Sequence, residues 1–290
     1  MTILQGFDER QLTLNGIRIN FVIKGDGPPL LLLHGYPETH AMWHKIAPQL
    51  AEHFTVVVPD MRGYGDSEKP KSDPQHVTYS KKSTAADQAA LMSALGFERF
   101  MVAGHDRGAR VTHRMCRDYP ERVLRAAVFD IIPTVEMYAR VTAYTATANF
   151  PWFFYIQPYP FPETLLEGKS DFYLDHMVKM IGEHVISPEA LAEYRRCMRD
   201  PASLHAGFED YRAGASIDSE QDKADADKKI LCPLLVVWGA TSAVGTAFDP
   251  ISIWRDYAID VQGEAVPGGH FMVEESPRET LKAMLDFFRN

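Results

Sequence analysis

Five continuous apolar runs of strand length constrain the fold of this chain more than any other feature of its sequence. They are LLLLHG (30–35), FTVVVPD (54–60), FMVAGHD (100–106), RAAVFD (125–130) and LLVVWG (234–239). Apolar runs without polar alternation are typical of strands that are buried on both faces of a parallel sheet. Each run ends in a polar or glycine turn, so each is predicted to be one buried strand.

Segments of helical character separate these runs. They cover residues 40–52, 79–96, 107–119 and 276–289, while QLTLN and RINFVIK, on either side of Gly16, are typical of a hairpin. The alternation of strand and helix predicts an α/β fold with a mostly parallel, doubly wound sheet. In such sheets functional groups lie at the carboxyl ends of the strands.

The strand and helix alternation stops between Pro133 and Ser216. This stretch contains the aromatic segment NFPWFFYIQPYPFPE and helical stretches such as PEALAEYRRCMRD, but no strand-like run. We predict a helical cap at 134–216, inserted into a core formed by 1–133 and 217–290, with aromatic side chains above the strand ends. The alternative is an ordinary helical subdomain packed on the core.

Charge and cysteine content limit the partners and the compartment. The formal net charge of -9 argues against nucleic acid and anionic membranes as partners, because these polyanions attract basic surfaces. The three cysteines are odd in number and widely spaced, which suggests no disulfide framework and favours a reducing cytoplasm. The N-terminal MTILQGFDERQL lacks the apolar run of a signal peptide, so a cytoplasmic location is expected.

The stretch VAGHDRGAR (102–110) has the spacing of a nucleophile elbow, G-x-S-x-G, with Asp106 in the place of the serine. Gly104 and Gly108 flank it, because the turn is tight and the following helix comes close. An apolar strand precedes the motif and a helical stretch follows it. This is the structural context that an elbow requires.

An aspartate at the elbow predicts displacement at carbon. A serine that attacks a saturated carbon would form an ether, which water does not readily cleave, whereas an aspartate forms an alkyl ester that activated water hydrolyses. A carboxyl group with an ordinary pKa of about 3.9 is already ionised at neutral pH. Asp106 therefore needs no base for the first step, and a base is required only for the second.

Arg107 and Arg110 lie three residues apart at the start of the predicted helix, on nearly the same face. Two cations at a helix N-terminus oppose the helix dipole unless an anion lies between them, and planar guanidinium groups suit a carboxylate. The alternative is that one of the arginines forms a salt bridge with an acid of the cap or the sheet.

Further motifs complete a recognisable pattern: HGYPETHAMW (34–43), PDMRGYGDSEKP (59–70) and GGHF (268–271). With the elbow, the chain resembles the α/β-hydrolase superfamily, in the aspartate-nucleophile branch that contains haloalkane dehalogenases, epoxide hydrolases and haloacetate dehalogenases. The spacing H-D-R-G-x-R resembles the haloacetate (fluoroacetate) dehalogenase family in particular. In that family two arginines hold the substrate carboxylate, which implies this role for Arg107 and Arg110.

The resemblance also implies the remaining catalytic groups. His270 is expected to be the base that activates water, and Asp130 the acid that orients it. Asp130 ends RAAVFD, whereas WGATSAV, after the later strand, has no acid near its tip and Asp249 lies ten residues beyond Gly239.

Main-chain groups are expected to form an oxyanion hole. The resemblance assigns this role to the NH groups of Tyr36 and Arg107, which would stabilise the charge that develops on the attacked ester. His34 and His105 are interpreted as structural neighbours of the turns.

The halide site of the resembled family consists of His, Trp and Tyr side chains. Trp152 and Tyr211 fall at matching places, but Pro151 replaces the histidine and donates no hydrogen bond. Because fluoride is the poorest leaving group, we expect weak activity on fluoroacetate and better activity on chloro- and bromoacetate. Another cap histidine, such as His184, is an alternative donor.

The sequence therefore predicts a hydrolytic dehalogenase of short 2-haloacids, with a small anionic substrate and water as partners and a homodimer as a possible assembly. No metal or organic cofactor is expected. Epoxide hydrolysis is the enzymatic alternative, in which cap tyrosines protonate the epoxide: the candidates are Tyr138, Tyr144, Tyr155 and Tyr211. A ligand-binding member of the fold without turnover is the non-enzymatic alternative.

Overall fold

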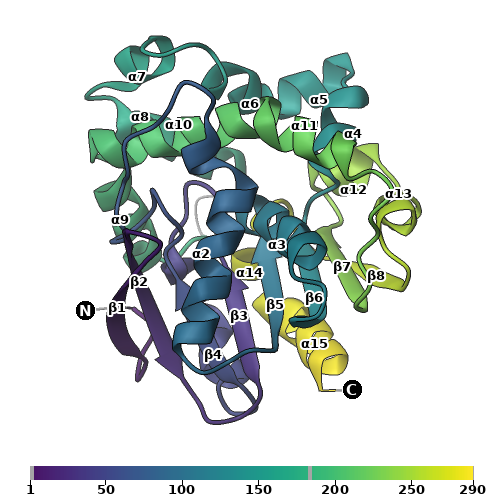
Figure 1. The fold of residues 1–290 in the computed structure, drawn as a ribbon. Helices are drawn as coiled ribbons and strands as arrows, with labels where there is room; N and C mark the ends of the chain where they lie inside the picture. Colours follow the sequence, from purple (N-terminus) through teal and green to yellow (C-terminus); the bar gives the residue numbers. More distant parts are fainter. Residues whose placement is uncertain (1–2, 182–184, 290) are drawn as a thin grey trace.

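An eight-stranded sheet forms the centre of the computed structural model, which describes residues 3–181 and 185–289 (Figure 1). Its strands are β1 (Asp8–Leu14), β2 (Ile17–Lys24), β3 (Pro29–Leu33), β4 (Thr55–Pro59), β5 (Phe100–His105), β6 (Val123–Phe129), β7 (Leu234–Gly239) and β8 (Val261–Val266). Their order across the sheet is β1-β2-β4-β3-β5-β6-β7-β8. β1 and β2 form an antiparallel hairpin, β2 pairs antiparallel with β4, and the remaining pairs are parallel.

The predicted fold class is confirmed. The five apolar runs form β3 to β7, and β4, like most of β3, β5 and β7, is buried. β8 has no apolar run, because it is an edge strand whose residues are mostly exposed, and the sequence pattern therefore did not indicate it.

Helices outside the 134–216 stretch flank the sheet. They are η1 (His40–Lys45), α1 (Ala47–Leu50), η2 (Val77–Tyr79), α2 (Lys81–Ala94), α3 (Asp106–Asp118), α11 (Ile217–Ala224), α12 (Ala243–Ala247), α13 (Pro250–Tyr257), α14 (Met272–Glu275) and α15 (Pro277–Phe288). α2 and α3 lie side by side in front of the sheet in Figure 1. The Ser80 side chain caps α2 by accepting a hydrogen bond from the Ser83 NH group.

The chain between β6 and α11 is helical throughout its described elements, and we refer to residues 134–216 as the helical segment. Its helices are α4 (Thr134–Ala139), α5 (Ala143–Ala148), α6 (Phe150–Tyr155), α7 (Phe161–Leu166), α8 (Ser170–Ile181), α9 (Pro188–Met198) and α10 (Pro201–Ala215). Figure 1 shows most of them gathered at one end of the sheet. α4 begins at Thr134 and α10 ends at Ala215, while the division into core and cap domains at 134–216 stays a prediction.

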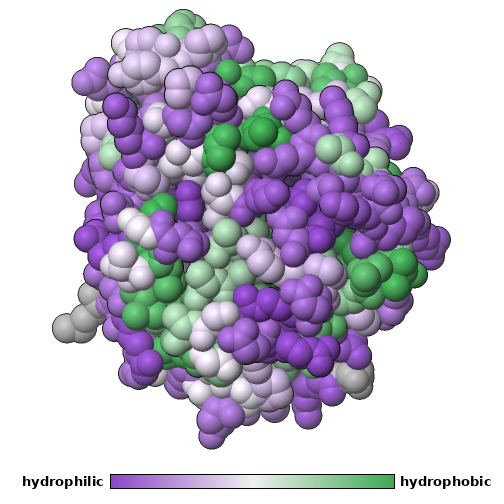
Figure 2. Space-filling view, viewed as in Figure 1, coloured by the Kyte–Doolittle hydropathy of each residue, from purple (hydrophilic) through white to green (hydrophobic). Residues whose placement is uncertain are grey.

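Polar side chains cover most of the face shown in Figure 2, and hydrophobic side chains appear there in separate groups. The large apolar side chains of the central strands are instead buried, as in Leu30, Val57 and Phe129. Of the helices that the structure describes, none combines the length and apolarity needed to cross a bilayer.

Candidate active site

Asp106 lies at a strained turn between β5 and α3. Its φ of 44° falls in the left-handed region, which a residue with a side chain rarely adopts. A Cβ on Gly104 would lie 2.4 Å from the Gly108 carbonyl oxygen, and one on Gly108 would lie 2.5 Å from the His34 carbonyl oxygen. The two glycines therefore allow strand, turn and helix to come together around the Asp106 carboxylate.

The Asp106 carboxylate is buried and stabilised in its charged form. Its Oδ2 accepts a hydrogen bond of 3.1 Å from the Tyr36 NH group. Burial alone would raise the pKa of Asp106, but the charges of His270, Arg107 and other nearby cations outweigh burial and hold this pKa below its ordinary value. The structure thus brings the first predicted oxyanion donor to the nucleophile. The role of the Arg107 NH group, directly after Asp106, stays a prediction.

Asp130 holds the ring of His270. The His270 Nδ1 atom lies 2.6 Å from Asp130 Oδ2, while Asp130 Oδ1 accepts hydrogen bonds from the Gly239 NH group and the Ser242 hydroxyl. With three partners the buried carboxylate is fixed, and it fixes the orientation of the imidazole. Asp249 instead caps α13 through the Ser252 NH group.

His105 holds the backbone of His270, a contact that the sequence did not indicate. Its Nδ1 atom lies 2.9 Å from Glu38 Oε2 and its Nε2 atom lies 2.7 Å from the His270 carbonyl oxygen. Because both partners are acceptors, both ring nitrogens must donate, and the imidazole is a cation. Burial opposes this charge, but Glu38 overcomes it and raises the pKa of His105 to about 9.

His34 differs from His105 in its charge state. Its Nε2 atom accepts from the Met61 NH group while its Nδ1 atom lies 2.8 Å from the Gly35 carbonyl oxygen, so one nitrogen must be unprotonated. Burial lowers the pKa of His34, in agreement with a neutral ring. This histidine supports the turns after β3 and β4.

Arg107 forms a buried ion pair with Asp210 of α10. Its Nη2 atom donates to Asp210 Oδ1 and to the Asp210 carbonyl oxygen, each at 2.7 Å, and its Nε atom donates to Oδ2 at 3.3 Å. The guanidinium also lies 4.2 Å from the centre of the Tyr211 ring. Arg107 is thus paired with an acid of the helical segment, as the alternative interpretation of these arginines allowed.

The Asp210 carboxylate joins three elements of the core to α10. Besides Arg107 of α3, it accepts hydrogen bonds from the Lys81 ammonium of α2 and, at 2.6 Å, from the hydroxyl of Tyr64, which follows β4. Burial lowers the pKa of Lys81, and the charge of Arg107 lowers it further. This network anchors the helical segment beside the nucleophile.

Arg110 is a buried cation without an acidic partner. Its Nη1 atom donates to the Thr134 hydroxyl at 2.8 Å and to the Ile132 carbonyl oxygen at 3.2 Å, and its Nε atom has no partner among the described residues. None of the described carboxylates pairs with it. Burial and the charge of Arg107 lower the pKa of Arg110 to about 10, which leaves it charged at neutral pH.

One cavity of about 380 Å³ brings most of these groups together. Asp106, Asp130, His270 and Arg110 line it from the core, whereas Arg107 is absent from its described lining. A guanidinium without an ion-pair partner among the described residues and a buried carboxylate in the same cavity favour a substrate that carries both an anionic group and an electrophilic carbon.

The residues predicted to bind halide border this cavity from the helical segment. Trp152 of α6 lines it, and its ring lies 4.5 Å from the Arg110 guanidinium. Tyr211 of α10 also lines it, and burial together with the charge of Asp106 raises the pKa of its hydroxyl, which therefore keeps its proton.

Pro151 occupies the first turn of α6, a position that tolerates proline, and faces the same cavity. Among the described residues of this lining, His270 is the sole histidine. His184, the alternative donor, lies outside the described residues.

The candidate tyrosines for epoxide chemistry are divided between two cavities. Tyr144, Tyr155 and Tyr211 line the large cavity, whereas Tyr138 lines a separate small one. The Tyr155 hydroxyl lies 2.6 Å from that of Tyr173, and the Tyr144 hydroxyl lies 2.9 Å from that of Thr246. Both hydroxyls therefore already have partners.

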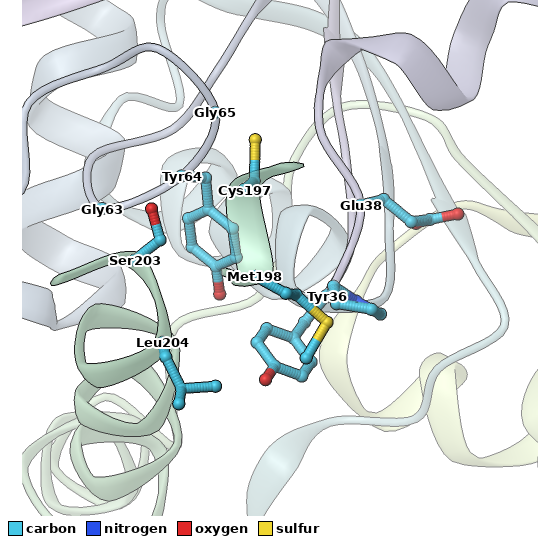
Figure 3. Close-up of a pocket in the computed structure, with 10 residues that line it drawn as sticks. Tyr36, Glu38, Gly63, Tyr64, Gly65, Cys197, Met198, Ser203 and Leu204 are labelled. Atoms are coloured by element: carbon cyan, nitrogen blue, oxygen red, sulfur yellow. The ribbon is translucent and has the colours of Figure 1, made fainter. Parts of the chain in front are cut away.

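A second cavity of about 20 Å³ also has Tyr36 in its lining, and Figure 3 shows this residue beside Tyr64, Met198 and Leu204, which line the same cavity. It has room for about one water molecule, so it is too small for a substrate. Across the described chain, no group of three or more His, Cys, Asp or Glu side chains has a geometry suited to a metal ion.

Comparisons with known proteins agree with this geometry. The alpha/beta hydrolase fold family matches residues 28–277. The chain is 41% identical over 288 residues to a fluoroacetate dehalogenase from Burkholderia sp, covering 98% of this chain and 95% of that protein. It is 34% identical to a soluble epoxide hydrolase from Corynebacterium sp. (strain C12), covering 96% of both. A crystal structure from Nostoc sp PCC 7120, provisionally described as an alpha/beta hydrolase, is 50% identical, with a TM-score of 0.96 and 98% of each chain covered.

Proposed function

The chain belongs to the alpha/beta hydrolase family, and from this premise we propose that it is a hydrolytic dehalogenase that converts short 2-haloacids, such as haloacetates, to 2-hydroxy acids. One observation carries the proposal. The buried cation Arg110 has no acidic partner among the described residues and lines the same cavity as the carboxylate nucleophile Asp106. A neutral substrate would leave that buried charge uncompensated.

In the first step Asp106 attacks the α carbon of the substrate. A carboxylate oxygen forms a bond to that carbon while the carbon–halogen bond breaks and the halide leaves with the electron pair. Arg110 holds the substrate carboxylate, with Arg107 as the second arginine of the predicted clamp. Trp152 and Tyr211 donate to the departing halide, and the raised pKa of Tyr211 keeps its proton available for this contact.

In the second step water hydrolyses the Asp106 ester. His270 takes a proton from water as the water oxygen bonds to the carboxyl carbon of the ester. The bond from that carbon to the substrate oxygen then breaks, the leaving alkoxide takes a proton from the His270 imidazolium, and the 2-hydroxy acid leaves. Asp130 orients the imidazole through the 2.6 Å contact with Nδ1. The Tyr36 NH group, which already donates to Asp106, stabilises the negative oxygen of the intermediate together with the Arg107 NH group.

Pro151 sets the preferred halogen. It faces the cavity beside Trp152 and supplies no hydrogen-bond donor. Fluoride depends most on donors aimed at its developing charge, so we expect weak turnover of fluoroacetate relative to chloro- and bromoacetate. We further propose that residues 134–216 act as a cap over this site and that the enzyme needs no cofactor. We also propose a cytoplasmic location and a homodimer as the assembly.

Epoxide hydrolysis is the second candidate function. The soluble epoxide hydrolase from Corynebacterium supports it, as do three of the candidate tyrosines, Tyr144, Tyr155 and Tyr211, which line the cavity. The same Asp106 and His270 would act, and Tyr211 would protonate the epoxide oxygen. A neutral epoxide would leave the buried charge of Arg110 without an anionic partner, which argues against this candidate.

The first experiment follows halide release from bromoacetate, chloroacetate and fluoroacetate by the purified protein. We expect release of bromide and chloride, a loss of at least about 10³-fold in Asp106→Asn, and a large loss in Arg110→Leu. Absence of release from all three, with diol formation from an epoxide, would establish the second candidate instead. Tight binding of haloacetate without turnover would indicate a ligand-binding protein.

A further inference from the structure

The cavity is larger than a haloacetate requires. Chloroacetate has five heavy atoms, and even at roughly 30 Å³ for each, the share of one molecule in liquid water, it fills about 150 Å³. The hydrolytic water adds roughly 30 Å³. About half of the 380 Å³ would therefore hold neither the substrate nor the attacking water.

The remaining space has an apolar wall. The charged groups Asp106, Asp130 and Arg110 come from the strand ends and α3, on the core side. The other side is mainly apolar: its polar members include Tyr144 and Asn149, and its apolar members are Met137 of α4, Ala148 of α5, Pro151 of α6, Met177 of α8 and Val244 of α12. Side chains of this kind bind hydrocarbon more favourably than water.

Pro151 contributes to this wall in two ways. Its side chain has fewer atoms than that of histidine, and it presents carbon atoms where a histidine would present a hydrogen-bond donor. Pro151, which weakens a fluoride site, therefore also makes the space beside the reacting carbon larger and its lining less polar. Arg110 is fixed by Thr134 and Ile132, so the substrate carboxylate and the bond that breaks stay in place while a substituent extends away from them.

We propose that this enzyme prefers 2-haloacids with an apolar substituent on the α carbon, such as 2-halobutanoates and 2-halohexanoates, to haloacetates, which it also converts. This inference rests on the proposed dehalogenase function. Each buried methylene should improve kcat/KM roughly three- to fourfold until the space is filled.

The geometry also makes the reaction stereospecific. With the carboxylate on Arg110 and the halide opposite the Asp106 oxygen, the two remaining positions on the α carbon are not equivalent. Because the lining differs between the core side and the side of the helical segment, we expect one enantiomer alone to place its substituent in the open space. Attack by Asp106 inverts the α carbon, and ester hydrolysis breaks the bond to the Asp106 carboxyl carbon, so the product keeps the inverted configuration.

The test compares bromoacetate with both enantiomers of 2-bromobutanoate and 2-bromohexanoate in the wild type and in two variants that fill the wall, Ala148→Leu and Val244→Phe. Ala146→Leu, on the same helix but outside the described lining, is the matched control. We expect one enantiomer of each longer acid to exceed bromoacetate in kcat/KM by about tenfold or more. The filling variants should lose at least tenfold on the longer acids and less than threefold on bromoacetate.

Three results overturn the inference. A preference for bromoacetate over both longer acids would show that the space is not a substrate site. Equal losses on long and short acids in both filling variants, with Ala146→Leu unaffected, would contradict the assigned position of the substituent. If no acid, bromoacetate included, releases bromide, the proposed function itself falls and the inference with it.

Discussion

Arg107 and Arg110 stand three residues apart on α3 but lie in two different electrostatic regions. Arg107 is surrounded by the Asp210 network, in which one carboxylate accepts from Arg107, Lys81 and Tyr64. Arg110 is buried against Trp152 with only neutral oxygens as hydrogen-bond partners. The comparison teaches that similar side chains in one motif can have different surroundings: Arg107 is paired with an acid of α10, whereas Arg110 has no ion-pair partner among the described residues, which is why the proposed carboxylate site rests mainly on Arg110.

The largest expected effect is on activity, in Arg110→Leu. Removing one partner of a buried, hydrogen-bonded charge pair costs about 2–5 kcal/mol, so kcat/KM for chloroacetate should fall roughly 30-fold to several thousandfold. Arg110→Lys keeps the charge but loses the planar fork, and its loss should be smaller. The measurement is steady-state chloride release. A loss below tenfold in the leucine variant would remove Arg110 from substrate binding.

Asp210→Asn is expected to lower the free energy of unfolding, whereas the effect of Arg110→Leu is on activity. This change leaves Arg107 buried without its carboxylate, while Lys81 keeps only the longer contact of 3.6 Å with Asp218, and breaking a buried pair costs about 3–5 kcal/mol in the free energy of unfolding. Urea denaturation measures it, with Arg110→Leu as the matched control. Because Arg110 has no acidic partner, its loss should change that free energy by no more than about 1 kcal/mol. Equal destabilisation of the two variants would erase the distinction between the regions.

The ion pair between His105 and Glu38 is expected to make the free energy of unfolding depend on pH. Glu38 raises the pKa of His105 above its unfolded value, against the effect of burial, to about 9. The stability that this pair contributes is therefore fully present below about pH 6.5 and is lost as the pH rises through 9. We expect the free energy of unfolding to fall by about 3 kcal/mol over that window. His105→Asn should lack this component, and parallel pH profiles of wild type and variant would contradict the assignment.

The smallest expected effect concerns Tyr64→Phe. The variant removes one of the donors to Asp210 while both cations remain, so the carboxylate stays satisfied. We expect a loss of about 1 kcal/mol in the free energy of unfolding and little change in kcat/KM. A large loss of activity without loss of stability would place Tyr64 in contact with the substrate.

The local motifs explain why the sequence indicated Asp106, Asp130 and His270. Asp106 and Asp130 directly follow apolar strands, so their position at the carboxyl edge of the sheet follows from their place in the chain, whereas His270 was indicated by the GGHF motif. The structure brings the three together, and their catalytic roles remain proposals.

Long-range pairs explain what the sequence could not indicate. Asp210 lies 129 residues from Lys81 and 103 residues from Arg107, and no local pattern connects α10 with α2 and α3. From the sequence, His34 and His105 were both interpreted as structural neighbours of turns. In the structure the Nδ1 atom of His105 lies 2.9 Å from Glu38 Oε2, whereas that of His34 lies near the Gly35 carbonyl oxygen. Charge states of buried groups depend on such partners, which the three-dimensional fold alone supplies.

The central claim is that Asp106 forms an alkyl ester that water cleaves at the carboxyl carbon. Its most direct test is a single turnover of excess enzyme with bromoacetate in H₂¹⁸O, followed by mass spectrometry of the peptide that contains Asp106 and of the glycolate formed. The account predicts ¹⁸O in the Asp106 side chain and none in the glycolate, because the product oxygen comes from the nucleophile. Labelled glycolate with an unlabelled Asp106 peptide would show direct attack of water on the substrate and would contradict the account.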